Sequence, residues 1–176
     1  MHRHLIRFSL ILGITFLLAA CGFQLRGTGG NSAPLPPAWK SMHLVTGNPN
    51  GEFSRAVIAQ LAANGVQWTD RESANFSLVL SPERFEQRSL SLNAEARVAE
   101  FELTMSSQFS IVDASNKEVV PPSSVIVIKQ MENDPRNVVG KEGEVQLIQN
   151  EMRTDLAQQI VRRVNFYATS SSSDSP

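Results

Sequence analysis

The sequence predicts an α+β domain built as a two-layer sandwich, with two helices packed on one face of a four-stranded, mostly antiparallel sheet. Two observations lead to this fold class. Apolar residues recur at steps of three and four in two segments and at every second position in others, which are the periods of helices and half-buried strands. The segments follow the order β-α-β-β-β-α, and two apolar helix stripes need a common sheet surface for their burial. We place this single domain at residues 39–167.

The first segment, residues 1–20, predicts a cleaved lipoprotein signal peptide. Arg3 and Arg7 precede an apolar run from Phe8 to Ala20, and the sequence Leu-Ala-Ala-Cys that ends at Cys21 matches the lipobox of bacterial lipoprotein precursors. As a helix the run reaches only ~20 Å, short of the ~30 Å hydrocarbon core of a membrane. We therefore expect Cys21 to become the first residue and to carry a diacylglycerol on its thiol and a palmitoyl chain on its amino group. Several acyl chains together hold a protein stably on a membrane.

Composition argues against nucleic-acid binding and against catalysis. Without Arg3 and Arg7, 14 of the 16 basic residues remain against 17 acidic ones, whereas nucleic-acid-binding domains are strongly basic. Cys21 is the only cysteine, and His43 is the only histidine outside the leader. The sequence therefore offers neither a nucleophilic triad motif nor a clustered set of metal ligands. We expect no enzymatic activity, no metal, no cofactor and no nucleic-acid partner.

The first part of the mature chain predicts a tether, a strand and a helix. Residues 21–38 are rich in Gly and Pro, which is typical of a flexible linker. Trp39 to Thr46 has the apolar content of a strand, and a helix is expected from about Glu52 to Ala63, ended by Asn64-Gly65. Its apolar stripe, at steps of four, consists of Phe53, Val57 and Leu61.

Three further strands are expected in succession. The second runs from Phe76 to Ser91 with a break at Pro82, the third from Ala99 to Ile111, and the fourth from about Glu118 to Gln130. In the third strand, apolar residues alternate strictly with polar ones, so one face is buried and the other stays open to water or to a partner. The open row consists of Glu100, Glu102, Thr104, Ser106, Gln108 and Ser110.

The last helix is expected from about Lys141 to Phe166. Steps of three and four give it a single apolar stripe, formed by Val145, Ile148, Met152, Leu156, Ile160 and Val164. Residues 168–176 are dominated by serine, which predicts a disordered tail.

Several stretches make the chain resemble a known family. They are Cys21-Gly22-Phe23-Gln24-Leu25-Arg26, then Asn48-Pro49-Asn50-Gly51 with Ser54-Arg55-Ala56-Val57, then Ala99-Glu100-Phe101, and finally Asn133-Asp134-Pro135, Lys141 and Asn150-Glu151-Met152. In this order, and over most of the mature chain, they are similar to the lipopolysaccharide-assembly lipoprotein family LptE, also called RlpB.

The resemblance implies a lipoprotein of the outer membrane that faces the periplasm and forms a one-to-one complex with the β-barrel LptD. Such proteins sit inside the barrel as a plug, support its assembly and help to deliver lipopolysaccharide to the outer leaflet. The resemblance also implies lipopolysaccharide binding by Lys141, which has the family's spacing from Asp134-Pro135. A second family position, an arginine in the turn between strands two and three, has no clean counterpart in the turn Asn93-Ala94-Glu95-Ala96. Arg88 and Arg97 flank this turn, and whether either of them takes that place stays open.

Topology gives a separate reason to group basic residues. If successive elements alternate in direction, the connections 47–52, 89–97 and 131–142 share one end of the sandwich. Four basic residues fall near that end, and they are Arg88, Arg97, Arg136 and Lys141. Such a cluster suits the phosphates of lipid A, which accept charge-assisted hydrogen bonds. Acidic neighbours leave the alternative that these are ordinary solvated charges.

A second function is compatible with the same sequence features. In this alternative the chain is an independent periplasmic lipoprotein that binds an amphipathic ligand between its helices and its sheet.

Overall fold

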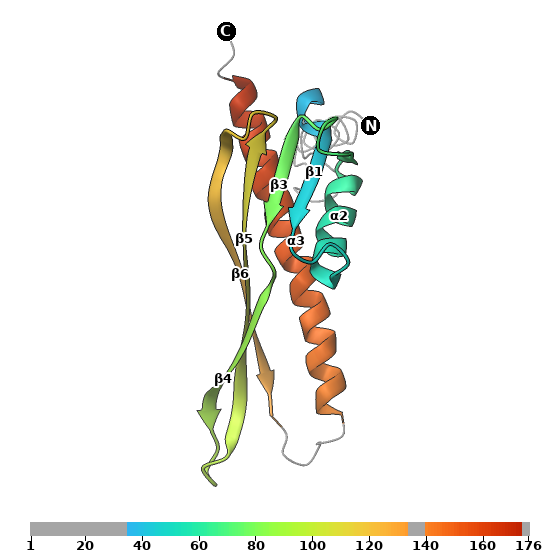
Figure 1. Cartoon of the computed structure of the whole chain (residues 1–176). Helices are drawn as coiled ribbons and strands as arrows, with labels where there is room; N and C mark the ends of the chain where they lie inside the picture. Colours follow the sequence, from blue (N-terminus) through green and yellow to red (C-terminus); the bar gives the residue numbers. More distant parts are fainter. Residues whose placement is uncertain (1–34, 134–139, 174–176) are drawn as a thin grey trace, which may run out of the picture. The chain divides into compact units, whose positions relative to one another are not determined.

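The computed structural model describes residues 35–133 and 140–173 of the chain. Two α-helices and six strands succeed one another, preceded by a short 3-10 helix (Figure 1). In chain order the elements are η1 (Pro37–Lys40), β1 (Ser41–Thr46), α2 (Glu52–Ala63), β2 (Gln67–Trp68), β3 (Phe76–Leu80), β4 (Arg84–Leu92), β5 (Val98–Asp113), β6 (Glu118–Glu132) and α3 (Lys141–Ser173). The α+β class and the two helices are confirmed.

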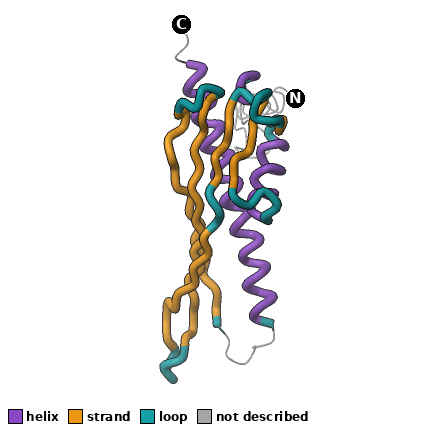
Figure 2. Tube along the Cα trace, viewed as in Figure 1, coloured by secondary structure: helices purple, strands orange, loops and turns teal. Residues whose placement is uncertain are grey.

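The six strands form one mixed sheet that is organised by β5. β6 pairs antiparallel along one edge of β5, while β3 and β4 pair one after the other along the opposite edge. β1 lies parallel to β3, and β2 lies parallel to β1. The β4–β5 turn therefore lies at one end of the strands and the β5–β6 turn at the other (Figure 2).

The expectation of four strands is wrong, because the expected second strand is divided and β2 is an additional short strand. The division occurs at Ser81-Pro82, where proline has no amide hydrogen to donate to a neighbouring strand. The Ser107 hydroxyl donates to the Ser81 carbonyl at 2.9 Å, and the Ser81 amide donates to the Gln108 carbonyl at 2.9 Å. These bonds keep the chain against β5 while it passes from β3 to β4.

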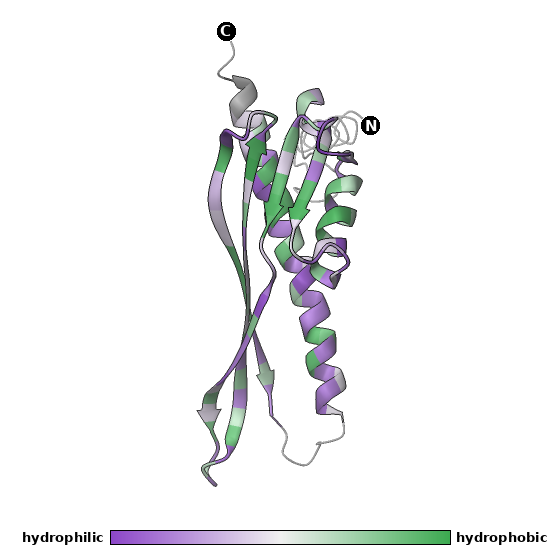
Figure 3. Cartoon of the chain, viewed as in Figure 1, coloured by the Kyte–Doolittle hydropathy of each residue, from purple (hydrophilic) through white to green (hydrophobic). Residues whose placement is uncertain are grey.

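The predicted apolar faces are buried except near Lys141, where Phe101, Val145 and Ile148 are half-buried. In β5 the buried residues alternate as expected and include Leu103, Met105, Phe109 and Ile111. One hydrophobic cluster joins them to buried side chains of α2, α3, β1, β3 and β6. Colouring by hydropathy shows this apolar content on β1 and β3 and a more hydrophilic N-terminal half of α3 (Figure 3). The stacking of both helices on one sheet face stays a prediction.

Ordered and buried residues precede the predicted boundary at residue 39. Leu35 is buried, and Trp39 belongs to η1 rather than to a strand. The indole of Trp39 is buried and stacks on Phe76, with 4.5 Å between ring centroids. Pro37 begins the 3-10 turn, a position that needs no amide hydrogen. The end of the expected tether is therefore part of the core.

Helix α3 continues to Ser173, past the predicted boundary at residue 167. Ala168 is buried, and the hydroxyls of Thr169 and Ser170 donate to the carbonyls of Asn165 and Phe166 at 2.9 and 3.0 Å. These hydroxyl groups therefore bond within the helix, which a compositional argument for disorder does not take into account. Among the helices of the described residues, none is long and apolar enough to cross a membrane.

The first testable prediction concerns the α3 stripe. Leu156 is fully buried, so Leu156→Ala should lower the free energy of unfolding by about 2–5 kcal/mol through lost burial and a residual cavity. Leu147 lies on the same helix with 70% of its surface exposed, and Leu147→Ala should change the value by less than about 0.5 kcal/mol. Urea unfolding of both variants measures the difference, and equal losses would contradict the assigned stripe.

Candidate functional site

Lys141, the first residue of α3, is held by the neighbouring ends of β5 and β6. Its Nζ atom lies 4.3 Å from the ring centroid of Phe101 and donates a hydrogen bond to Oδ1 of Asn133. Asn133 is fixed in turn, because its amide donates to the Ala99 carbonyl at 2.8 Å and its Nδ2 donates to the Val98 carbonyl at 2.6 Å. The cation is therefore half-buried and positioned by an aromatic face and an amide oxygen.

A pocket of about 500 Å³ opens beside Lys141 along the first turns of α3. Its lining combines one cation, one carboxylate, two amides and one apolar side chain, from Lys141, Glu142, Gln146, Gln149 and Val145. The volume is within the range of small-ligand sites. Amides and an ammonium group together offer hydrogen-bond donors to phosphate or sugar oxygens.

Arg97 lies at the same end of the strands as Lys141. The β4–β5 turn is closed by Asn93, whose Oδ1 accepts hydrogen bonds from the amides of Glu95 and Arg97 at 3.1 and 2.9 Å. Ala96 adopts the left-handed conformation that this tight turn requires, with φ of 58°. Arg97 immediately precedes Val98, which accepts the side-chain bond from Asn133, and the Arg97 side chain is exposed.

Arg88 is not brought together with Lys141. It faces Glu102 across the β4–β5 pair, with 2.7 Å between Nε and Oε1, and this carboxylate raises the pKa of Arg88. Successive side chains of a strand point to opposite sides of the sheet. Because Lys141 covers Phe101, the next residue, Glu102, points to the opposite side and Arg88 points there with it. Arg136 and Cys21 lie outside the described residues.

The expectation that residues 47–52 share this end is wrong. Glu52, at the start of α2, pairs with Arg153 of α3, with 2.6 Å between Oε2 and Nη1. Arg153 follows Lys141 by about 12 residues, or roughly 18 Å along the helix. The connection between β1 and α2 therefore meets α3 near its middle, because β1 and β3 are much shorter than β5.

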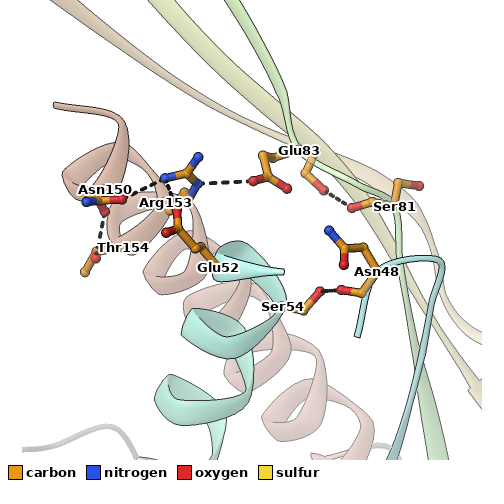
Figure 4. A network of polar contacts seen from close by, with 9 residues as sticks. Asn48, Glu52, Ser54, Ser81, Glu83, Asn150, Arg153 and Thr154 are labelled. Atoms are coloured by element: carbon orange, nitrogen blue, oxygen red, sulfur yellow. Dashed lines mark hydrogen bonds and ion pairs between the residues drawn. The ribbon is translucent and has the colours of Figure 1, made fainter. Parts of the chain in front are cut away.

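Arg153 is the centre of a polar network that the sequence did not reveal (Figure 4). Besides Glu52, its guanidinium contacts Glu83 in the β3–β4 connection, with 3.1 Å between Nε and Oε1, and donates to Oδ1 of Asn150 at 2.7 Å. Only 17% of the Arg153 side chain is exposed. One side chain thus joins α3 to the start of α2 and to the point where β3 gives way to β4.

A second set of polar contacts aligns α3 with β6. Lys129 pairs with Glu151 and Asp155 at 2.7 and 3.3 Å, and the hydrogen bond to Glu151 is the main cause of its raised pKa. Further along, Nε2 of Gln159 donates to the Ile126 carbonyl at 2.9 Å. Later residues of α3 therefore meet earlier residues of β6, so the two elements run antiparallel.

The open side of β5 is less uniformly polar than the sequence predicts. Ile126 and Ile128 of β6 stand opposite Ser106 and Thr104, and they are 51% and 59% exposed. The sequence did not predict this exposure, because Val125 to Ile128 are all apolar and no alternation with polar residues indicates which side chains face outward. In the described part of the chain no group of His, Cys, Asp and Glu side chains is arranged to hold a metal ion.

The comparisons with known proteins agree with one another. The family model described as "LptE: Lipopolysaccharide-assembly" matches residues 39–164. An "LPS-assembly lipoprotein LptE" of Pectobacterium atrosepticum is 30% identical over 161 residues, which is 89% of this chain and 84% of that protein. The protein of the same description from Yersinia enterocolitica is 29% identical over 92% of this chain and 76% of its own length.

Solved structures extend this agreement to the fold. The crystal structure of the rare lipoprotein B from Shewanella oneidensis has a TM-score of 0.62 at 27% identity and covers 69% of this chain and 91% of that one. The solution structure of an uncharacterized lipoprotein B from Nitrosomonas europaea has a TM-score of 0.69 at 21% identity and covers 84% of this chain and 93% of that one. At 21% identity, the similarity to the Nitrosomonas europaea structure shows a shared fold and nothing further.

The second testable prediction concerns the Arg153 network. Arg153→Met leaves the carboxylates of Glu52 and Glu83 without their shared cation, so we expect a loss of about 1–2 kcal/mol in the free energy of unfolding. Arg162→Met is the control, because Arg162 is exposed and has no ion pair among the described residues. In urea unfolding, a loss equal to that of the control would contradict the role of Arg153.

Proposed function

Because this chain belongs to the LptE family of lipopolysaccharide-assembly lipoproteins, we propose that it acts in lipopolysaccharide transport as the plug and assembly partner of the β-barrel LptD. In this proposal acyl chains on Cys21 hold it on the periplasmic side of the outer membrane. It contacts lipopolysaccharide directly through Lys141 and Arg97. Family membership carries the transport role, and the positioned cation at Lys141 is the observation that carries direct contact.

Direct contact is supported by how Lys141 is held. An exposed lysine loses much side-chain entropy when it binds a ligand, whereas Phe101 and Asn133 already restrict the Lys141 ammonium. Its hydrogen-bond partner is a neutral amide, so the positive charge is not cancelled by that contact. The adjoining pocket and Arg97 supply further donors for phosphate oxygens.

The same geometry favours Arg97 over Arg88 as the counterpart of the family arginine. Arg97 lies beside the Val98–Asn133 contact that holds Lys141, whereas Arg88 is paired with Glu102 on the other side of the sheet. A single ligand at Lys141 can therefore meet Arg97 without crossing the sheet.

The plug role is supported by the open side of β5. Thr104, Ser106 and Gln108 suit the polar lumen of a large barrel, and the exposed Ile126 and Ile128 offer apolar contacts beside them. The alternative, an amphipathic ligand between helices and sheet, has no such support. Buried side chains such as Leu103, Met105 and Met152 belong to one cluster there, and a ligand would have to displace them.

The third testable prediction concerns the barrel. The full acylated chain, affinity-purified from outer membranes in detergent, should retain a large β-barrel protein at a ratio of about one to one. Replacing Ile126 and Ile128 together by Asp should reduce the recovered barrel, while Leu147→Asp, an exposed change on α3, serves as the control. Recovery of the chain without any barrel would overturn the plug proposal.

The fourth testable prediction concerns lipopolysaccharide. Replacing Arg136 and Lys141 by Asp should weaken lipopolysaccharide binding about tenfold or more, because charge-assisted hydrogen bonds are lost. Arg97→Asp should weaken binding in the same direction, whereas Arg88→Asp and Lys40→Asp should not. Circular dichroism verifies that each variant is folded. Unchanged binding in the Arg136 and Lys141 double variant would overturn direct contact at this site.

A further inference from the structure

The end of the domain opposite Lys141 is defined by strand register. Ser41 begins β1, Phe76 begins β3 beside it, and Asp113 ends β5 opposite Phe76. Glu118 begins β6 at the same level. The described chain enters the fold here, because η1 and Leu35 immediately precede β1.

The C-terminal part of α3 reaches this same end. Gln159 contacts Ile126, and α3 runs antiparallel to β6, so its later residues approach the start of β6 (Figure 1). Over its 33 residues α3 spans roughly 50 Å. Lys141 and the last turns of α3 are therefore at opposite ends of one rigid element.

An unusual group of exposed side chains lies on these later turns. Phe166 is 68% exposed, and Arg162 and Arg163 precede it by four and three residues on the same helix face. We call these three residues the α3 C-terminal patch. The Phe166 ring rests edge-on against Tyr167, with 5.7 Å between centroids, so the aromatic group is supported in an outward position.

The charges of the patch are not explained by contacts within the fold. After Asp155 the described part of α3 has no acidic residue, and neither Arg162 nor Arg163 has an ion pair among the described residues. A favourable interaction with the helix dipole is confined to the last turn, and both arginines lie about ten residues before Ser173. The carboxylate of Asp113, at this end of β5, accepts hydrogen bonds from Ser115 and Lys117 in its own turn.

We propose that the α3 C-terminal patch rests on the anionic phospholipid surface of the membrane that holds Cys21. This proposal rests on the proposed acyl anchor. Leu35 and η1 lie at the end of the fold that carries the patch, and Cys21 precedes Leu35 by about 14 residues, a reach of at most ~48 Å. Arginines attract anionic headgroups and an aromatic ring inserts at their level, which is the pairing found in the patch. The domain then stands with Lys141 directed away from that surface.

The experiment uses the acylated full chain in vesicles of phosphatidylethanolamine and phosphatidylglycerol with brominated acyl chains. Phe166→Trp and Leu147→Trp each introduce one indole at similar exposure but at opposite ends of α3. The parent chain, with its two buried or half-buried tryptophans, supplies the background. We expect bromine to quench the indole introduced at 166 and not the one introduced at 147.

Charge reversal tests the electrostatic part. Each basic residue near an anionic surface favours docking by about fivefold, so Arg162→Glu with Arg163→Glu should abolish most quenching at position 166. Vesicles of brominated phosphatidylcholine alone, which carry no anionic lipid, should likewise abolish most quenching of the Phe166→Trp chain that keeps both arginines.

Two outcomes distinguish a failure of the patch proposal from a failure of the acyl-anchor proposal. Mass spectrometry that finds no acyl chains on Cys21 would overturn the anchor, and the membrane orientation with it. An acylated chain whose indole is quenched at 147, or at neither position, would overturn the patch proposal alone.

Discussion

The alternation of side chains along β5 is the constraint on which the rest of the structure depends. This strand is paired on both edges, by β6 on one and by β3 and then β4 on the other. Because residues of a strand alternate between two sides, the burial of Leu103, Met105, Phe109 and Ile111 fixes the side of every neighbour. A slip of one residue would expose this core and bury Glu102 and Gln108. Register is therefore set by the hydrophobic effect over the whole strand.

β5 is much longer than β1, β3 and α2, so these elements lie along only part of it. The longer helix α3 extends along the remaining part. At one end α3 joins the main cluster through Met152, Leu156, Ile160 and Val164. At the other end Val145 and Ile148 are only half-buried against this cluster, and Lys141 adds contacts to Phe101 and Asn133. Arg153 lies between these two parts of α3, and its ion pairs hold the start of α2 and the β3–β4 connection against the helix. The part of α3 after Arg153 is thus held by more fully buried apolar side chains than the part before it.

This division gives the domain two chemically different ends. The end with Lys141 and Arg97 presents restrained and exposed cations beside a pocket, which suits an anionic amphipathic ligand. The end where the chain enters presents arginines and an exposed phenylalanine, which suits a phospholipid surface. Between Lys141 and Phe166 the helix rises by roughly 38 Å. Under the two proposals, one end of the domain meets the ligand while the other stays at the membrane.

The sequence by itself determined the local features of this protein. The stripe of α2, the alternation of β5, the stop at Asn64-Gly65 and the turn at Asn93 follow from periods of 3.6 and 2 and from the backbone preferences of a few residues. Tertiary structure alone decided that Arg88 and Lys141 lie on opposite sides of the sheet, that Arg153 joins three elements, and that the chain from Leu35 and the serine-rich end of α3 belong to the fold. The physical reason is that these features depend on pairings between residues far apart in the chain. No local period encodes which edge of β5 receives β4, or which carboxylates meet a given arginine.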